Sequence, residues 1–119
     1  MAVLDPDREH FSCDGTIIVR LDGEIDIATA EDAYFRLSSA VLESCAVVDL
    51  SGVGFIDASG VNALIGAARL ASGRQRHLLI ASAPRQLHRI LDVLELRAVL
   101  PTHQDTVAAR ATHAAWAAH

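Results

Sequence analysis

Lysine is absent from this sequence of 119 residues, and its ten basic residues are all arginines, scattered along the chain. The 15 acidic residues outnumber them, so that the formal net charge is -5. Proteins that bind nucleic acids neutralise phosphates with clustered lysine and arginine side chains. Because such a cluster is missing, we expect no nucleic-acid partner.

Long apolar runs are missing as well. No stretch of about 18 apolar residues could cross a membrane, and the chain does not open on the basic-then-apolar pattern of a secretory signal. We therefore expect a cytoplasmic protein without a membrane partner. The two cysteines, Cys13 and Cys45, are expected to be reduced thiols in that compartment, with a disulfide switch between them as the alternative.

Residue patterns that hold metals or nucleotides are also lacking. The six histidines are not spaced as ligands with one another or with the cysteines. The glycines of residues 52–60 do not form a phosphate-binding loop, which would end in Gly-Lys-Ser or Gly-Lys-Thr. We therefore predict no metal and no cofactor. Aromatic residues make up only 4% of the chain, so its core must be aliphatic.

The sequence does contain hydrophobic residues, 51% of the total, in short runs that alternate with amphipathic stretches. The length suits one domain over residues 1–119. The predicted strands are residues 10–13, 16–21, 46–50, 77–81 and 98–100, and the first two form a hairpin. The predicted helices begin at Thr29, at Ser59, at Pro84 and within residues 102–105. This order predicts an α/β fold with a mixed, largely parallel sheet of about five strands and about four helices.

Each predicted helix has an apolar face at helical spacing. In chain order these faces comprise Ala33, Leu37, Ala40 and Val41; then Val61, Leu64, Ile65 and Ala68; then Leu87, Ile90, Leu91 and Leu94; and finally Val107, Ala111 and Trp116. The first helix opens with a capping-box pattern from Thr29 to Asp32 and should run to about Glu43.

The central stretch, residues 46–73, contains the tetrapeptide pattern Asp-x-Ser-Gly twice. The first copy, residues 49–52, closes a predicted strand, which makes Ser51 a turn hydroxyl. The second copy, residues 57–60, is followed at once by an amphipathic helix that ends at Gly73. Ser59 is therefore predicted to be the N-cap of that helix, close to the unpaired N–H groups of its first turn.

Three segments together resemble a STAS domain: residues 21–30 (LDGEIDIATA), residues 48–53 (VDLSGV) and residues 55–61 (FIDASGV). The resemblance covers about residues 8–110. The STAS family includes anti-sigma factor antagonists and the cytoplasmic tails of sulfate transporters. Because no membrane segment is attached, the chain is similar to the free-standing antagonists.

The resemblance implies regulation of transcription by partner switching rather than catalysis. In that cycle the unmodified antagonist binds an anti-sigma factor, a serine kinase of ATPase-type fold, and the sigma factor is freed. The kinase phosphorylates the motif serine, here Ser59, and a serine phosphatase resets it. Many relatives carry a serine before the acceptor, where this chain has Ala58. A monomer or weak dimer is expected. The implied partner-binding residues are Glu24, Asp26, Thr29, Asp57, Ala58, Gly60, Val61 and Asn62.

Three alternatives stay open for Ser59 and for the chain. Ser59 could be only a helix cap, in a STAS module that assembles or senses a ligand without phosphorylation. Asp57 could orient the partner or merely cap its turn. A nucleophilic serine enzyme is disfavoured, because the sequence lacks the Gly-x-Ser-x-Gly pattern of a nucleophile elbow.

Overall fold

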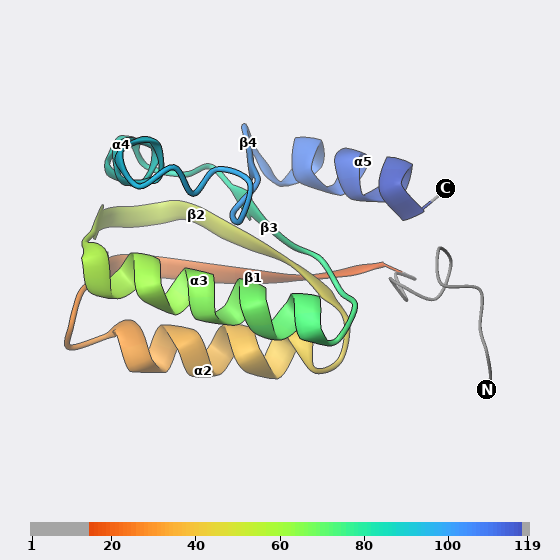
Figure 1. The fold of residues 1–119 in the computed structure, drawn as a ribbon, viewed down its shortest axis with the longest axis horizontal. Coiled ribbons are helices and arrows are strands. Elements are labelled where there is room, and N and C mark those ends of the chain that lie inside the picture. Colours follow the sequence, from red (N-terminus) through yellow and green to blue (C-terminus); the bar gives the residue numbers. More distant parts are fainter. Residues whose placement is uncertain (1–14, 118–119) are drawn as a thin grey trace.

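The computed structural model describes residues 15–117, in which a parallel sheet lies between two helical layers (Figure 1). The elements in chain order are β1 (Thr16–Ile25), α2 (Ala30–Val41), β2 (Cys45–Ile56), α3 (Ala58–Gly73), β3 (Leu78–Ala81), α4 (Arg85–Val93), β4 (Thr102–His103) and α5 (Thr106–Ala117). The strand order is β1-β2-β3-β4, and all three pairings are parallel. Helices α2 and α3 cover one face of the sheet, and α5 packs against the other face through Ala109. The buried leucines of α4, Leu87 and Leu91, belong to the same core cluster as the apolar residues of α2 and α3.

The α/β class and the largely parallel sheet are confirmed. The strand predicted at residues 10–13, and with it the opening hairpin, lies outside the described residues. The described sheet therefore has four strands rather than about five, and no antiparallel pair occurs among them.

Strands β1 and β2 are longer than the sequence predicts. β1 does not end at Asp22-Gly23 but continues to Ile25, with register irregularities on either side of this dipeptide and with Gly23 at a φ of 77° that favours glycine. β2 likewise continues through Ser51 to Ile56, so the prediction that Ser51 is a turn hydroxyl is wrong. Over these extensions β1 and β2 hydrogen-bond to each other, from Asp22 to Ile25 and from Gly52 to Ile56. The strand propensity of either segment alone does not predict this pairing.

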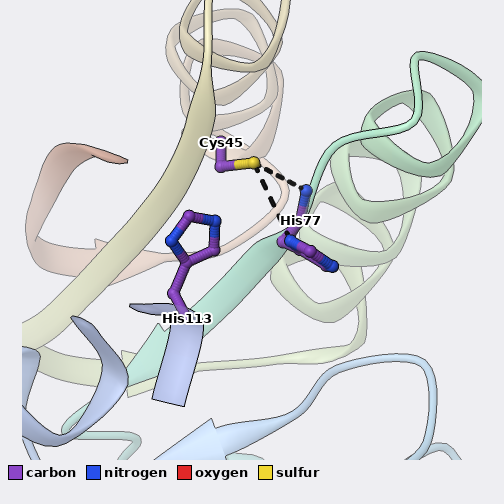
Figure 2. A group of neighbouring side chains, drawn as sticks. All are labelled: Cys45, His77 and His113. Atoms are coloured by element: carbon purple, nitrogen blue, oxygen red, sulfur yellow. Dashed lines mark hydrogen bonds between the residues drawn. The ribbon is translucent and has the colours of Figure 1, made fainter. Parts of the chain in front are cut away.

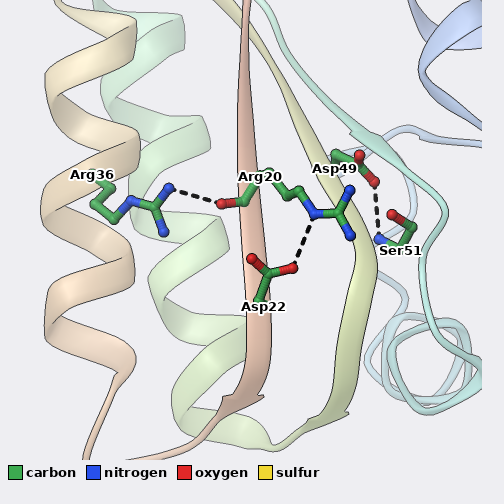
Figure 3. Close-up of polar contacts among 5 residues, drawn as sticks. All are labelled: Arg20, Asp22, Arg36, Asp49 and Ser51. Atoms are coloured by element: carbon green, nitrogen blue, oxygen red, sulfur yellow. Dashed lines mark hydrogen bonds and ion pairs between the residues drawn. The ribbon is translucent and has the colours of Figure 1, made fainter.

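A row of polar contacts anchors α2 alongside the first irregularity of β1 (Figure 3). The Arg36 guanidinium donates a 2.8 Å hydrogen bond to the backbone carbonyl of Arg20. Arg20 in turn forms a 3.0 Å ion pair with Asp22. Because all three side chains are exposed, these contacts position the helix more than they stabilise the fold.

The last strand is not residues 98–100, as predicted, but Thr102–His103. Residues 97–99 form a turn, and Leu100 is fully buried in the core. Ile80 donates its backbone N–H to the carbonyl of Pro101 at 2.9 Å, so pairing with β3 begins at the carbonyl of the proline and continues with Thr102. A proline has no N–H to offer a sheet, which explains the shift.

The core is aliphatic, and the predicted faces of the first two helices are confirmed. All four predicted residues of α2 are buried, as are Val61, Leu64 and Ile65 of α3, while Ala68 is partly buried against them. In α4, Leu87 and Leu91 are buried and Ile90 is partly buried. Leu94 is exposed because α4 ends one residue before it. Pro84 is the N-cap of α4 and not, as predicted, its first residue.

The predicted face of α5 is wrong for Val107 and Ala111, whereas the third predicted residue, Trp116, does contact the rest of the fold through His77. Val107 and Ala111 are exposed, and the residues that face the sheet are Ala109 and His113. The helix begins at Thr106, after Asp105, whose carboxylate accepts the N–H of Ala108 at 2.8 Å. In an alanine-rich helix every side is equally apolar, so periodicity does not indicate which side packs.

Candidate functional site

Helix α3 is capped by Asp57, not by Ser59 as predicted. The Asp57 carboxylate oxygen Oδ1 accepts the N–H groups of Ser59 at 2.9 Å and of Gly60 at 3.2 Å. The Asp57 carbonyl also accepts the N–H of Val61 at 3.0 Å. The expectation that the first turn of this helix offers unpaired N–H groups is therefore wrong for Ser59, Gly60 and Val61, and the positive end of the helix already holds a negative charge.

Ser59 is the second residue of α3 and is half-buried. Its hydroxyl makes no hydrogen bond with any residue in the described part of the chain. Its neighbours Ala58 and Asn62 are exposed. The hydroxyl thus lies in the first turn of the helix, outside the core and without a structural bond to break.

The two copies of Asp-x-Ser-Gly make the same local bond in different settings. Asp49 Oδ1 accepts the N–H of Ser51 at 2.9 Å (Figure 3). Asp57 Oδ1 accepts the N–H of Ser59 at the same distance. The bond from Ser51 lowers the pKa of the Asp49 carboxyl below its ordinary value. The first copy stays within β2, however, and only the second leads into a helix. Ser51 is exposed and so provides a natural control for Ser59.

The loop after β1 is tied together by Thr29. Its hydroxyl accepts the N–H of Asp26 at 3.0 Å and donates to the carbonyl of Glu24 at 2.8 Å. Thr29 does precede α2, but its side chain caps no helical N–H, so the predicted capping box is wrong. Its helical backbone, with φ -115° and ψ -7°, differs from the extended conformation that an N-cap side chain requires.

The structure brings the two predicted loops together at the carboxyl ends of β1 and β2. The N–H of Asp57 donates to the carbonyl of Ile25 at 3.2 Å, and Ile25 is paired with Ile56. Of the predicted partner-binding residues, Glu24, Thr29, Ala58 and Asn62 are exposed, Asp26 and Asp57 are half-buried, and Gly60 and Val61 are buried. The last two therefore support the site from inside.

Two apolar residues of this surface were missed by sequence reasoning. Ile27, in the loop after β1, is 84% exposed, and Phe55, opposite Glu24 in the sheet, is 39% exposed. The alternation of Ile25, Asp26 and Ile27 resembles a continuing strand, which would bury Ile27. Because β1 ends at Ile25, Ile27 instead projects from the loop.

We expect an Asp57→Ala variant to lose about 1–2 kcal/mol of unfolding free energy, because the N–H groups of Ser59 and Gly60 lose their acceptor. Urea denaturation of purified protein measures this loss. Asp49→Ala, which removes the equivalent bond from a strand, should cost less than ~0.5 kcal/mol. Equal losses would show that Asp57 does not act as a helix cap.

Comparisons with known proteins agree with this geometry. The family model of the STAS domain matches residues 12–109. An anti-sigma F factor antagonist of Paenibacillus polymyxa is 28% identical over 107 residues, which cover 87% of this chain and 90% of that protein. None of the helices within residues 15–117 combines the length and apolarity that a bilayer span requires.

Two solved structures show the same fold at low identity. The Bacillus cell fate determinant SpoIIAA in its phosphorylated form superposes with a TM-score of 0.64 at 17% identity, over 86% of this chain and 95% of that one. A sulfate transporter family protein from Wolinella succinogenes gives a TM-score of 0.73 at 20% identity, over 97% and 99% of the two chains. With the match to residues 12–109, these findings show that the chain belongs to the STAS domain family.

Proposed function

We propose that this chain is an anti-sigma factor antagonist that works by partner switching in the cytoplasm. Its unphosphorylated form binds an anti-sigma factor, a serine kinase of ATPase-type fold, and thereby frees a sigma factor. Phosphorylation of Ser59 reverses this, and a serine phosphatase restores the binding form. The observation that carries the proposal is the Ser59 hydroxyl at the start of α3, which bonds to none of the described residues and is flanked by exposed residues of both loops. The antagonist from Paenibacillus polymyxa supports it.

The charge around Ser59 explains how one modification could release a partner. A phosphate carries about 1.5 to 2 negative charges at neutral pH. Asp57 already occupies the N–H groups at the helix start, so the phosphate would remain directed outward, beside a carboxylate. Water accommodates this concentration of charge in the free protein. At a desolvated interface the same charge has no such compensation.

The exposed residues around Ser59 describe the partner's surface. Glu24 and Asp26 contribute acidic groups, and Ile27 and Phe55 contribute apolar area. A complementary partner would offer arginine or lysine side chains opposite Glu24 and Asp26, an apolar hollow that receives Ile27, and no basic side chain opposite the first turn of α3. Ile27 has the exposure of a docking residue, because no side chain among residues 15–116 covers it.

Incubation with a candidate anti-sigma factor and Mg-ATP tests the proposal. The γ-phosphoryl group passes from ATP to the Ser59 oxygen, the hydroxyl proton is released, and ADP leaves. Intact-mass measurement should show one added phosphoryl group on wild type, none on Ser59→Ala, and one on the matched control Ser51→Ala. Modification at Ser51, or no modification by a kinase that binds the chain, would contradict the proposal.

The fold likeness to a sulfate transporter family protein favours a second candidate, a STAS module that assembles or binds a ligand without phosphorylation. If the chain is such a module, wild type and the Ser59→Asp variant should bind the partner with equal affinity.

A further inference from the structure

Three potential metal ligands meet at the end of the sheet opposite Ser59 (Figure 2). They are Cys45 at the start of β2, His77 just before β3 and His113 on α5. One ligand atom from each residue lies within 4.8 Å of the other two. The histidine Nδ1 of His77 is 3.9 Å from the Cys45 sulfur, and the ring of His113 is directed at that sulfur.

The strand register explains why these residues meet. Ala46 pairs with Leu78, so Cys45 and His77 are neighbours one position earlier on β2 and β3. Side chains alternate along a strand, which places both residues on the face that carries Val47 and Leu79. That face packs against Ala109 of α5. His113 follows Ala109 by four residues and so lies on the same side of the helix.

The surroundings of the cluster leave one of its ligand atoms without a hydrogen-bond partner among the described residues. His77 is half-buried, and its ring centroid lies 5.2 Å from that of His113 in an edge-on arrangement. His113 is only 3% exposed, and its Nε2 has no hydrogen-bond partner in the described part of the chain. The backbone N–H of His77 donates to the Cys45 sulfur at 3.2 Å, a bond that would support a thiolate.

We propose that Cys45, His77 and His113 form a zinc(II) site that fastens α5 to the sheet. One thiolate and two imidazoles are preferred ligands of this borderline-soft ion, and a water molecule would complete the tetrahedron. Binding releases the Cys45 thiol proton to solvent and involves no redox change. Zinc–ligand bonds of about 2.0 to 2.3 Å require the ligands to close in by roughly 1 Å, which side-chain rotation supplies.

The ion can reach the cluster from solvent. A surface pocket of about 180 Å³ is lined by His77 and by Trp116, whose ring centroid lies 4.8 Å from that of His77.

A metal ion at this site would also help to hold α5 against the sheet. Ala109 is the only buried apolar residue of α5 among the described residues, so the helix has little apolar area to hold it.

Titration of tag-free, metal-depleted protein with zinc sulfate, in competition with a chromophoric chelator, tests the proposal. Wild type should bind one zinc ion per chain, and zinc should raise its midpoint of thermal unfolding. Cobalt(II), as a probe of the same site, should give a thiolate charge-transfer band in the near ultraviolet and visible bands typical of tetrahedral coordination.

Cys45→Ala should lose the charge-transfer band and at least about tenfold in zinc affinity. His77→Gln, at a half-buried position, is a second test that does not depend on the folding of Cys45→Ala, and it should weaken zinc binding similarly. The control His103→Gln, a half-buried histidine of β4 outside the cluster, should leave the affinity unchanged. Wild type without zinc binding, or variants that bind as wild type does, would overturn the proposal.

Discussion

A Ser59→Asp variant is expected to bind the anti-sigma factor about a hundredfold more weakly than wild type, a loss of about 3 kcal/mol. The added carboxylate lies in the first turn of α3, where Asp57 already places a negative charge on the helix N–H groups. A partner that covers this turn must remove water from both charges without neutralising them. Isothermal titration calorimetry with a purified anti-sigma factor measures the change.

Two controls separate this effect from other consequences of substitution. Ser59→Ala removes the acceptor hydroxyl but adds no charge, so its affinity should stay within a few-fold of wild type. Ser51→Asp adds the same charge to the other Asp-x-Ser-Gly copy, on exposed β2, and should also bind normally. Equal affinity of wild type and Ser59→Asp would contradict the switch while leaving the fold and the zinc site untouched.

A Gly60→Val variant is expected to lose about 3 kcal/mol of unfolding free energy, because this position leaves no space for a side chain. A Cβ atom here would lie 2.6 Å from Ile56 Cγ1 and 2.7 Å from the backbone carbonyl of Ile25. That carbonyl also accepts the N–H of Asp57, so a side chain would separate the two loops of the site. The midpoint of thermal unfolding should fall by about 10 °C.

The control for this variant lies in the same helix. Gly73 ends α3, and a Cβ there would have no atom within 4 Å. Gly73→Ala should therefore leave the stability unchanged or raise it by a few tenths of a kcal/mol, up to ~1 kcal/mol. If both glycine variants unfold at the wild-type temperature, α3 can move away from β1, and the close approach at Gly60 is not required.

The parts of the fold that were predictable are those whose side chains carry a clear pattern. The β-branched run of residues 46–50 is buried on both faces, and it indicated the centre of the sheet. Helix α2 has a distinct apolar side, and all four residues assigned to it are buried. The position of Ser59 at the start of a helix followed from the second Asp-x-Ser-Gly motif.

The remaining features depend on pairing between distant segments. The extension of β2 through its serine and glycines is held by β1, and neither strand has the propensity to predict it alone. Asp57 rather than Ser59 caps α3, since the strand ends one residue before Asp57 and not at residue 50. Cys45 and His77 are 32 residues apart and meet only through the register of β2 with β3, so sequence spacing does not reveal the cluster.

The length of β2 makes its two ends electrically independent. Its 12 residues span about 35 Å at the usual rise of a parallel strand, from Cys45 to the residue before Asp57. The Debye length at physiological ionic strength is only about 8 Å. A divalent cation at the amino end and a phosphate at the carboxyl end would each sit within its own ionic atmosphere. Neither could alter the other's affinity through space, and any communication between them would have to be mechanical.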